Sequence, residues 1–166
     1  GCEKIYHLGD LIGIGSTPEL CIDICRDFEV VQIKGNHDDL VASGMPEEPQ
    51  ALMSDSEFQH QHWTHSRLEK SSREYIRSFP FERTERIEGV SVRFVHFELE
   101  ENGRSFVSMH PNMSDEVLCG LFRHSEFDLV LFGHVHRLID KTIKGVHYHC
   151  EPSLGCSSDS LARFSV

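Results

Sequence analysis

The stretch from Val31 to Leu40, VQIKGNHDDL, brings together several residue types that could do chemistry. Gly35 and Asn36 fit a plain turn, because both residue types tolerate a positive φ angle. A turn does not require a histidine at position 37. A metal site at the end of a strand would use the two neighbours differently, with the amide oxygen of Asn36 as a ligand and the imidazole of His37 as an acid. The stretch alone leaves both interpretations open.

Residues of ligand type recur where other strands are predicted to end. The carboxyl ends of parallel strands are where α/β sheets build their sites. Carboxylate, amide oxygen and imidazole together suit divalent metals such as Mn, Fe, Zn or Ni, and the lack of cysteine among them argues against a structural zinc. Taken singly each signal is weak, since a histidine in a strand is more often packed than ligating. The residues are Asp10 after YHLG, Asn36 and His37 after VQIKG, His96 within RFVHF, and His134 and His136 after LVLFG.

Two familiar catalytic motifs are missing from the sequence. Gly13 and Gly15 suggest a nucleotide-binding loop, but the G-x-G-x-x-G spacing fails because Pro18 holds its last position. No G-x-S-x-G elbow occurs, so a serine hydrolase lacks support.

The first third of the chain predicts a βαβ unit. Residues 4–10 and 29–35 are expected to be strands, and residues 16–28 a helix that Ser16 or Thr17 caps. A strand, a helix and a strand within about 30 residues predict two parallel strands, whose carboxyl ends meet at one edge of a sheet. This arrangement would bring the ligand-type residues after the two strands together.

The rest of the chain predicts a helical insert followed by a strand-rich region. Residues 39–80 are expected to form the insert, in which the polar segment 55–79 makes two helices that stand off the sheet. Because His134 and His136 alternate, they would face the same way in an extended strand. The remaining elements are strands at 81–88 and 90–97 with a turn at Glu88-Gly89, a helix at 114–125 capped by Ser114, a strand at 127–136 that breaks at Gly133, a hairpin at 138–155 that turns at Lys144-Gly145, and a final strand at 162–166.

The bulk composition narrows the function classes. The chain has 166 residues and a net charge of −11, which disfavours nucleic acid and anionic membrane surfaces as partners. A phosphate-bearing substrate is still compatible with this charge, because bound divalent metals invert the local field. No apolar run approaches the ~18 residues of a spanning helix. The six cysteines form no C-x-x-C pair and indicate a reducing, cytoplasmic location.

Four motifs in this order resemble those of the calcineurin-like metallophosphoesterase family. The resemblance extends over nearly the whole chain and is closest to the compact bacterial and archaeal members, some of which cleave phosphodiesters or dinucleoside polyphosphates. It implies an α/β fold, a four-layer αββα sandwich, formed by a single domain over residues 1–166. The matching segments are Gly9-Asp10, Gly35-Asn36-His37-Asp38, His96 and Gly133-His134-Val135-His136.

The resemblance also implies a role for each motif residue. His37 would hydrogen-bond the phosphate or protonate the leaving oxygen. Two metals, about 4 Å apart in such sites, would clamp the phosphoryl oxygens and activate the attacking water. The implied ligands are Asp10, which bridges both metals; Asn36, His96 and His134, which complete the second site; and His136, which belongs to the first.

The chain departs from the family pattern in two places. The family opens with a strand that ends in Asp-x-His and supplies two ligands to the first metal, and no Asp-x-His occurs here. We therefore expect that an N-terminal segment of about 30 residues or more is missing, which leaves the domain and the first metal site incomplete. In addition, Phe97 follows His96 where many relatives have glycine.

Three further residues are weaker candidates for contact with a substrate. His65 and Arg67 lie in the helical insert and would point toward the phosphate, although a solvated helix face is the ordinary interpretation of this segment. His149 lies on the final hairpin and would approach the site, although packing is its ordinary role.

Two functions from different classes follow. The first is a metal-dependent hydrolase that acts on small phosphomonoesters, phosphodiesters or dinucleoside polyphosphates. The second is a non-catalytic metal-binding scaffold or interaction module, because some relatives of the same fold have lost the catalytic histidine. His37 favours the hydrolase. A nuclease is disfavoured by the acidic charge and by the lack of basic or aromatic strand-binding stretches.

Overall fold

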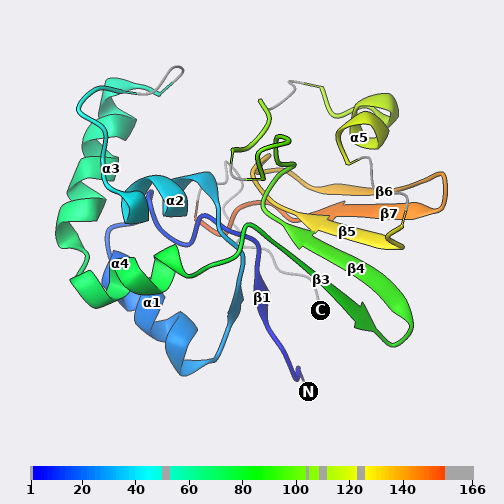
Figure 1. Cartoon of the computed structure of the whole chain (residues 1–166), viewed down its shortest axis with the longest axis horizontal. Helices are drawn as coiled ribbons and strands as arrows, with labels where there is room; N and C mark the ends of the chain where they lie inside the picture. Colours follow the sequence, from blue (N-terminus) through cyan, green and yellow to red (C-terminus); the bar gives the residue numbers. More distant parts are fainter. Residues whose placement is uncertain (1, 50–52, 104, 109–111, 123–125, 156–166) are drawn as a thin grey trace. The chain divides into compact units, whose positions relative to one another are not determined.

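The computed structural model describes residues 2–49, 53–103, 105–108, 112–122 and 126–155 (Figure 1). They belong to two compact units, Gly1–Pro80 and Phe81–Val166. The final strand predicted at 162–166 lies outside the described residues.

The first unit opens with the predicted βαβ arrangement. Strand β1 (Tyr6–His7) pairs in parallel with β2 (Val31–Gln32), and helix α1 (Pro18–Asp27) connects them. Thr17 takes the N-cap position, as one of the two predicted alternatives, although its side chain makes no capping hydrogen bond. Pro18 fits the first turn because its missing N–H would have no partner inside the helix. The prediction of parallel strands is confirmed.

Three more helices complete the first unit. Helices α3 (Asp55–Arg67) and α4 (Lys70–Arg77) are the two that the sequence predicts in the insert. Helix α2 (Asn36–Ser43) was not predicted, because Gly35 and Asn36 were expected to form a turn or part of a metal site at the end of a strand. The helix starts there because Gly35 takes the N-cap position in an extended conformation, with φ −94° and ψ 176°. The core of the unit consists of Ile12, Ile22, Val41, Ala42, Leu68, Ile76 and Phe79.

The second unit is built on a five-stranded sheet with the order β3-β4-β5-β7-β6 (Figure 1). Strands β4, β5 and β7 are parallel neighbours, whereas β3 and β6 are antiparallel strands at the two edges. The bounds are β3 (Glu82–Ile87), β4 (Val90–Val95), β5 (Leu129–Phe132), β6 (Ile139–Ile143) and β7 (Val146–Cys150).

Both hairpins of this sheet turn where the sequence predicts. Glu88 and Gly89 join β3 to β4 with φ angles of 48° and 90°, and Lys144 and Gly145 join β6 to β7 with φ angles of 51° and 87°. Two consecutive positive φ angles define the two-residue turn whose twist matches that of the flanking strands. Glycine at the second position is therefore the local signal that placed both turns.

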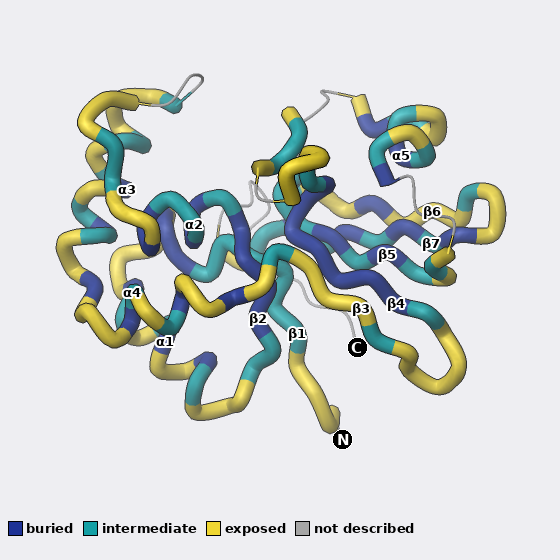
Figure 2. The backbone as a smooth tube through the Cα atoms, in the orientation of Figure 1, coloured by how far each residue is buried: buried dark blue, intermediate teal, exposed yellow. Residues whose placement is uncertain are grey.

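Helix α5 (Asp115–Leu121) packs on one face of the five-stranded sheet. The hydroxyl of Ser114 accepts a hydrogen bond from the Val117 amide at 3.4 Å, as expected of a helix N-cap. Leu118 belongs to the same buried cluster as Phe132 and Tyr148 of the sheet. Strand β4, the second strand of the sheet, is buried along most of its length (Figure 2). No helix in the described ranges is long and apolar enough to cross a membrane.

Candidate functional site

The loop after β1 brings Asp10 to the first turn of α2. Asp10 has a positive φ of 57° and follows Gly9, whose φ is 92°. The His37 amide donates a hydrogen bond to Asp10 Oδ1 at 2.9 Å. This end of a helix carries the positive pole of its dipole, which favours a carboxylate. The Asp10 carboxylate is therefore positioned at the N-terminus of α2, with Asn36 as the first residue of that helix.

Asp38 fixes the geometry of this loop, and sequence reasoning assigned it no role. Its side chain is fully buried. Oδ2 accepts hydrogen bonds from the amides of Asp10 at 2.8 Å and Gly35 at 3.0 Å, and Oδ1 accepts from the Ile12 amide at 3.4 Å. One carboxylate thus ties the loop after β1 to the start of α2. The available signal was the spacing, because an acid three residues after an N-cap commonly bonds back to the N-cap amide.

Two glycines are required by close approach in the same region. A Cβ atom at Gly35 would lie 2.1 Å from Asp10 Oδ1 and 2.3 Å from the Asp10 nitrogen. A Cβ atom at Gly13 would lie 2.8 Å from the Cβ of His37, and the φ of Gly13 is +112°. The glycine that suggested a nucleotide-binding loop therefore serves to let His37 pack against the backbone.

His37 is buried, and Gln61 of α3 determines which of its ring nitrogens carries the proton. The Gln61 side-chain nitrogen donates to the Gly13 carbonyl at 3.1 Å, and the same nitrogen contacts His37 Nδ1. Because a carbonyl only accepts, the nitrogen of the Gln61 amide is the atom that faces both groups. Nδ1 of His37 therefore accepts, which leaves the ring proton on Nε2, 3.8 Å from Asp10 Oδ2. No feature of the sequence points to Gln61, which lies in a polar helix.

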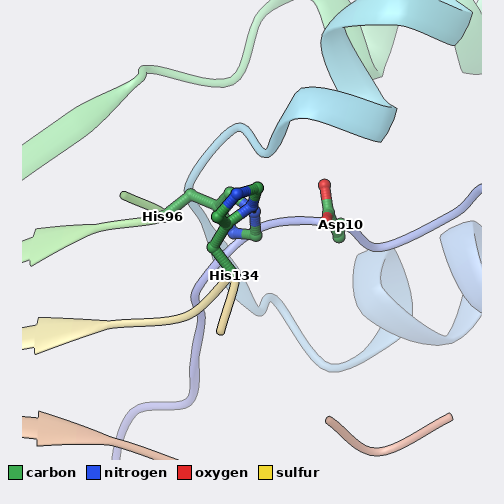
Figure 3. Close-up of side chains that lie close together, drawn as sticks. All are labelled: Asp10, His96 and His134. Atoms are coloured by element: carbon green, nitrogen blue, oxygen red, sulfur yellow. The ribbon is translucent and has the colours of Figure 1, made fainter. Parts of the chain in front are cut away.

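In the second unit, His96 and His134 follow two neighbouring parallel strands. His96 comes directly after β4, and Gly133, directly after β5, donates its amide hydrogen to the His96 carbonyl at 2.9 Å. His134 has a φ of 68°, so the chain turns out of the strand direction there. Nε2 of His96 and Nδ1 of His134 lie 3.2 Å apart (Figure 3). The sheet thus brings together two of the predicted metal ligands.

The separation of these two nitrogens fits a shared metal ion. Two imidazole nitrogens at about 2.1 Å from one ion and 3.2 Å from each other subtend an angle of about 100°. This angle lies between the octahedral and tetrahedral values. The His134 ring is also flanked by Phe97, with ring centroids 4.9 Å apart, and by Phe106, which stacks at 6.5 Å. The aromatic rings limit the rotation of His134 and so favour a fixed ligand direction.

His136 lies outside any strand. Strand β5 ends at Phe132, and both His134 and His136 have positive φ angles, of 68° and 52°. The strand thus breaks at Gly133 as the sequence predicts, and the alternation of an extended strand does not determine where the two histidines point. The break follows from Gly133, which the sequence had marked as the end of the buried run.

The three weaker candidates have other contacts. His65 Nδ1 bonds the Val41 carbonyl at 2.7 Å, which joins α3 to α2. Arg67 lies over the ring of Trp63, 5.4 Å from its centroid. His149 lies on β7, and its Nε2 is 3.1 Å from Glu151 Oε1.

The chain belongs to the calcineurin-like phosphoesterase superfamily. The sequence model of that domain matches residues 1–154. Among curated proteins, the uncharacterized protein MJ0912 of Methanocaldococcus jannaschii is 27% identical over 136 residues, which make up 82% of this chain and 52% of that protein. The chain thus spans about half the length of the curated relative that it matches.

Solved structures share the fold. The hypothetical protein PH1004 from Pyrococcus horikoshii has a TM-score of 0.78 at 19% identity, over 93% of this chain and 65% of its own. A metallophosphoesterase from Sphaerobacter thermophilus has a TM-score of 0.67 at 20% identity, over 96% and 69%. Wild-type Vps29 from Entamoeba histolytica, complexed with zinc, reaches 0.50 at 15% identity, over 96% and 62%. The predicted α/β fold of the metallophosphoesterase type is confirmed.

Proposed function

We propose that the protein is a metal-dependent phosphoesterase that hydrolyses small phosphomonoesters, phosphodiesters or dinucleoside polyphosphates. The observation that carries this proposal is His37, a buried histidine whose Nε2 bears the ring proton. A scaffold has no need of such a group. The burial of His37, the close approach of Gly13 and the contact with Gln61 hold the imidazole in one orientation.

The metal ligands are proposed from the family match. The family is divalent-metal dependent, and its sequence model covers all the motif residues. The spacing of the His96 and His134 nitrogens supports a shared ion. When bound, Mn, Fe, Zn or Ni supplies charge stabilisation at the phosphoryl oxygens and activates the attacking water. The proposed ligands are Asp10, Asn36, His96, His134 and His136.

His37 is proposed to act on the oxygen that leaves the phosphorus. With Nδ1 accepting from Gln61, the Nε2–H group of His37 can donate a hydrogen bond to a phosphoryl or leaving oxygen. Complete proton transfer needs a second ring proton on Nδ1, which requires Gln61 to present its side-chain oxygen instead. That oxygen is buried and lacks a hydrogen-bond partner among the described residues. Gln61 thus controls whether His37 acts as a hydrogen-bond donor or as a full acid.

The substrate and the surroundings are proposed on chemical grounds. The net charge of −11 favours a small phosphate ester or nucleotide over nucleic acid or a membrane. All cysteines in the described part of the chain are free thiols, which supports a reducing cytoplasm. His65, Arg67 and His149 stay predictions as substrate contacts.

The test compares two substrates with different leaving groups. The protein that carries this chain, at its full length and loaded in turn with Mn, Fe, Zn and Ni, is assayed on bis-p-nitrophenyl phosphate and on an alkyl phosphodiester. Replacing His37 with Ala should keep the metal content and slow the alkyl diester by about 10²–10⁴-fold, because general-acid catalysis contributes that much. The p-nitrophenyl ester should lose less, because its leaving group scarcely needs a proton.

Four outcomes count against this proposal. Equal losses on the two substrates would make His37 a phosphate clamp, and loss of metal would make it a ligand. Replacing Asp10 with Asn should remove metal and activity together, and retention of both would refute its bridging role. If none of the four metals gives activity, the scaffold function replaces the enzyme.

A further inference from the structure

A second group of ligand-type side chains lies on the β6–β7 hairpin. In the antiparallel register Asp140 faces His149, and Thr142 faces His147. Residues directly opposite each other, and residues two apart on one strand, share a face of the sheet. Val146, Tyr148 and Cys150 point into the core, so the two histidines and Asp140 lie on the other face.

The three side chains approach one another closely. Asp140 Oδ1 lies 2.5 Å from His147 Nε2 and 3.6 Å from His149 Nδ1. One ligand atom from each of the three falls within 4.8 Å of the others. The side chains of Asp140 and His147 are 57% and 46% exposed, whereas that of His149 is 17% exposed. An ion from solvent can therefore reach Asp140 and His147, whereas the burial of His149 holds the third ligand in place.

Glu151 orients His149 in the way that a metal ligand requires. Its Oε1 is 3.1 Å from His149 Nε2, and because a carboxylate only accepts, that nitrogen carries a proton. In the neutral ring, Nδ1 then presents a lone pair toward Asp140 Oδ1. The pair at 3.6 Å is too long for a hydrogen bond. Metal-ligating histidines commonly donate their other ring N–H to a carboxylate, as His149 does here.

The hydrogen bond with His147 lowers the pKa of the Asp140 carboxyl, which favours its anionic form. The carboxylate oxygen of Asp140 and the lone pair of His149 Nδ1 repel each other, and a cation bound to both atoms would remove this repulsion. Two atoms at about 2.1 Å from one ion and 3.6 Å from each other subtend about 120°. His147 and Asp140 must open from 2.5 Å to about 3.4 Å for tetrahedral geometry, and both side chains are exposed enough to move.

We propose that Asp140, His147 and His149 form a surface site for a zinc-class divalent cation, with Glu151 as the residue that positions His149. Two imidazoles and one carboxylate suit Zn, Ni or Co better than the all-oxygen preference of Mg or Ca. Water completes the coordination. Because its ligands come from β6 and β7, the ion clamps this edge of the sheet.

The site shares no residue with the four phosphoesterase motifs, although His149 is also a predicted substrate contact. In the parallel register of β5 and β7, His147 lies level with Leu129 and His149 with Leu131. His134 follows the end of β5 at Phe132. The two histidine groups of the second unit are thus offset along the strand direction.

The test counts zinc per chain by mass spectrometry after chelation, reloading with zinc and removal of excess. Replacing His147 with Ala should remove one zinc per chain, and so should Asp140→Asn. Asp115→Asn is the matched control, because Asp115 is an exposed acid that only pairs with Lys141 at 2.8 Å. The same loss should occur when the change is added to a His134→Ala protein, whose proposed phosphoesterase site is already disrupted. Zinc counts that are equal in the wild type and the His147→Ala protein overturn the proposal.

Two further measurements examine the geometry. Replacing Glu151 with Ala should raise the zinc Kd by about 10–100-fold, the usual cost of losing such a partner. Nitrogen NMR of the histidine rings should show zinc on Nδ1 of His149 and on Nε2 of His147. Binding through Nε2 of His149 would overturn the assigned role of Glu151. Far-UV circular dichroism of each variant shows that a loss of zinc is not a loss of fold.

Discussion

Asp38 gives the sharpest quantitative prediction, because one fully buried carboxylate serves three backbone donors. Replacing it with Ala leaves the amides of Asp10, Gly35 and Ile12 without their acceptor. Hydrogen bonds to a charged group are worth about 1.5–3 kcal/mol each. The two bonds at 2.8 and 3.0 Å therefore account for about 3–6 kcal/mol, and the bond at 3.4 Å adds little.

Asp38→Asn is the matched control for this change. Oδ2 accepts both short bonds, so an amide oxygen in its place keeps them, and only the contact with Ile12 is replaced by an unfavourable N–H pair. We expect a loss of about 1–2 kcal/mol for Asn, well below the loss for Ala. Since a whole domain is stable by only about 5–15 kcal/mol, the Ala protein should be close to unfolding.

The assay is urea unfolding followed by tryptophan fluorescence. The single tryptophan, Trp63, lies on α3 in the same unit as Asp38, so its emission reports the part of the chain that the change affects. Extrapolation of the unfolding free energy to zero urea gives the difference between variants. A loss of unfolding free energy below about 1 kcal/mol for Asp38→Ala, or equal losses for the Ala and Asn variants, would refute the role of Asp38 as the acceptor that joins the loop after β1 to the start of α2.

The other predictions concern Gly35, Gln61 and Cys150. Replacing Gly35 with Ala should lower the melting temperature and the metal content, because the new Cβ atom would lie 2.1 Å from a carboxylate oxygen of Asp10. Gly15→Ala is the matched control and should leave both measurements unchanged, because no atom lies within 4 Å of a Cβ atom at that position. Replacing Gln61 with Leu should keep the metal content but slow turnover of the alkyl phosphodiester more than that of the p-nitrophenyl ester, since it frees the ring to change its protonated nitrogen; an unchanged ratio of the two rates would contradict this. Burial raises the pKa of the Cys150 thiol to about 12, so iodoacetamide at pH 8 should alkylate exposed Cys2 in the native protein and Cys150 only after unfolding. Because the folded state retains the Cys150 proton that the unfolded state releases above about pH 8.5, this group should make stability fall as the pH rises through that value.

Local signals were sufficient to predict most of the elements. The sequence predicted the parallel pairing of β1 and β2, the two helices of the insert and the turn at Lys144-Gly145. Each depends on a property that neighbouring residues determine by themselves, such as the period of the apolar residues or the freedom of glycine at positive φ. The start of α2 was missed because Gly35 and Asn36 suit a turn and a helix start equally well.

The motif residues could be recognised in the sequence, but the contacts that hold Asp10 and His37 in place could not. Asp38 lies 28 residues from Asp10, and Gln61 lies 24 residues from His37. No periodicity relates positions so far apart. Their contacts exist because the core of the first unit packs α2 and α3 against the loop after β1, where each buried polar group must find a partner. The sequence by itself therefore indicated which residues are candidates to bind metal or move a proton. Only the tertiary structure decided which nitrogen of His37 holds that proton, because this depends on the single atom that packing places beside the ring.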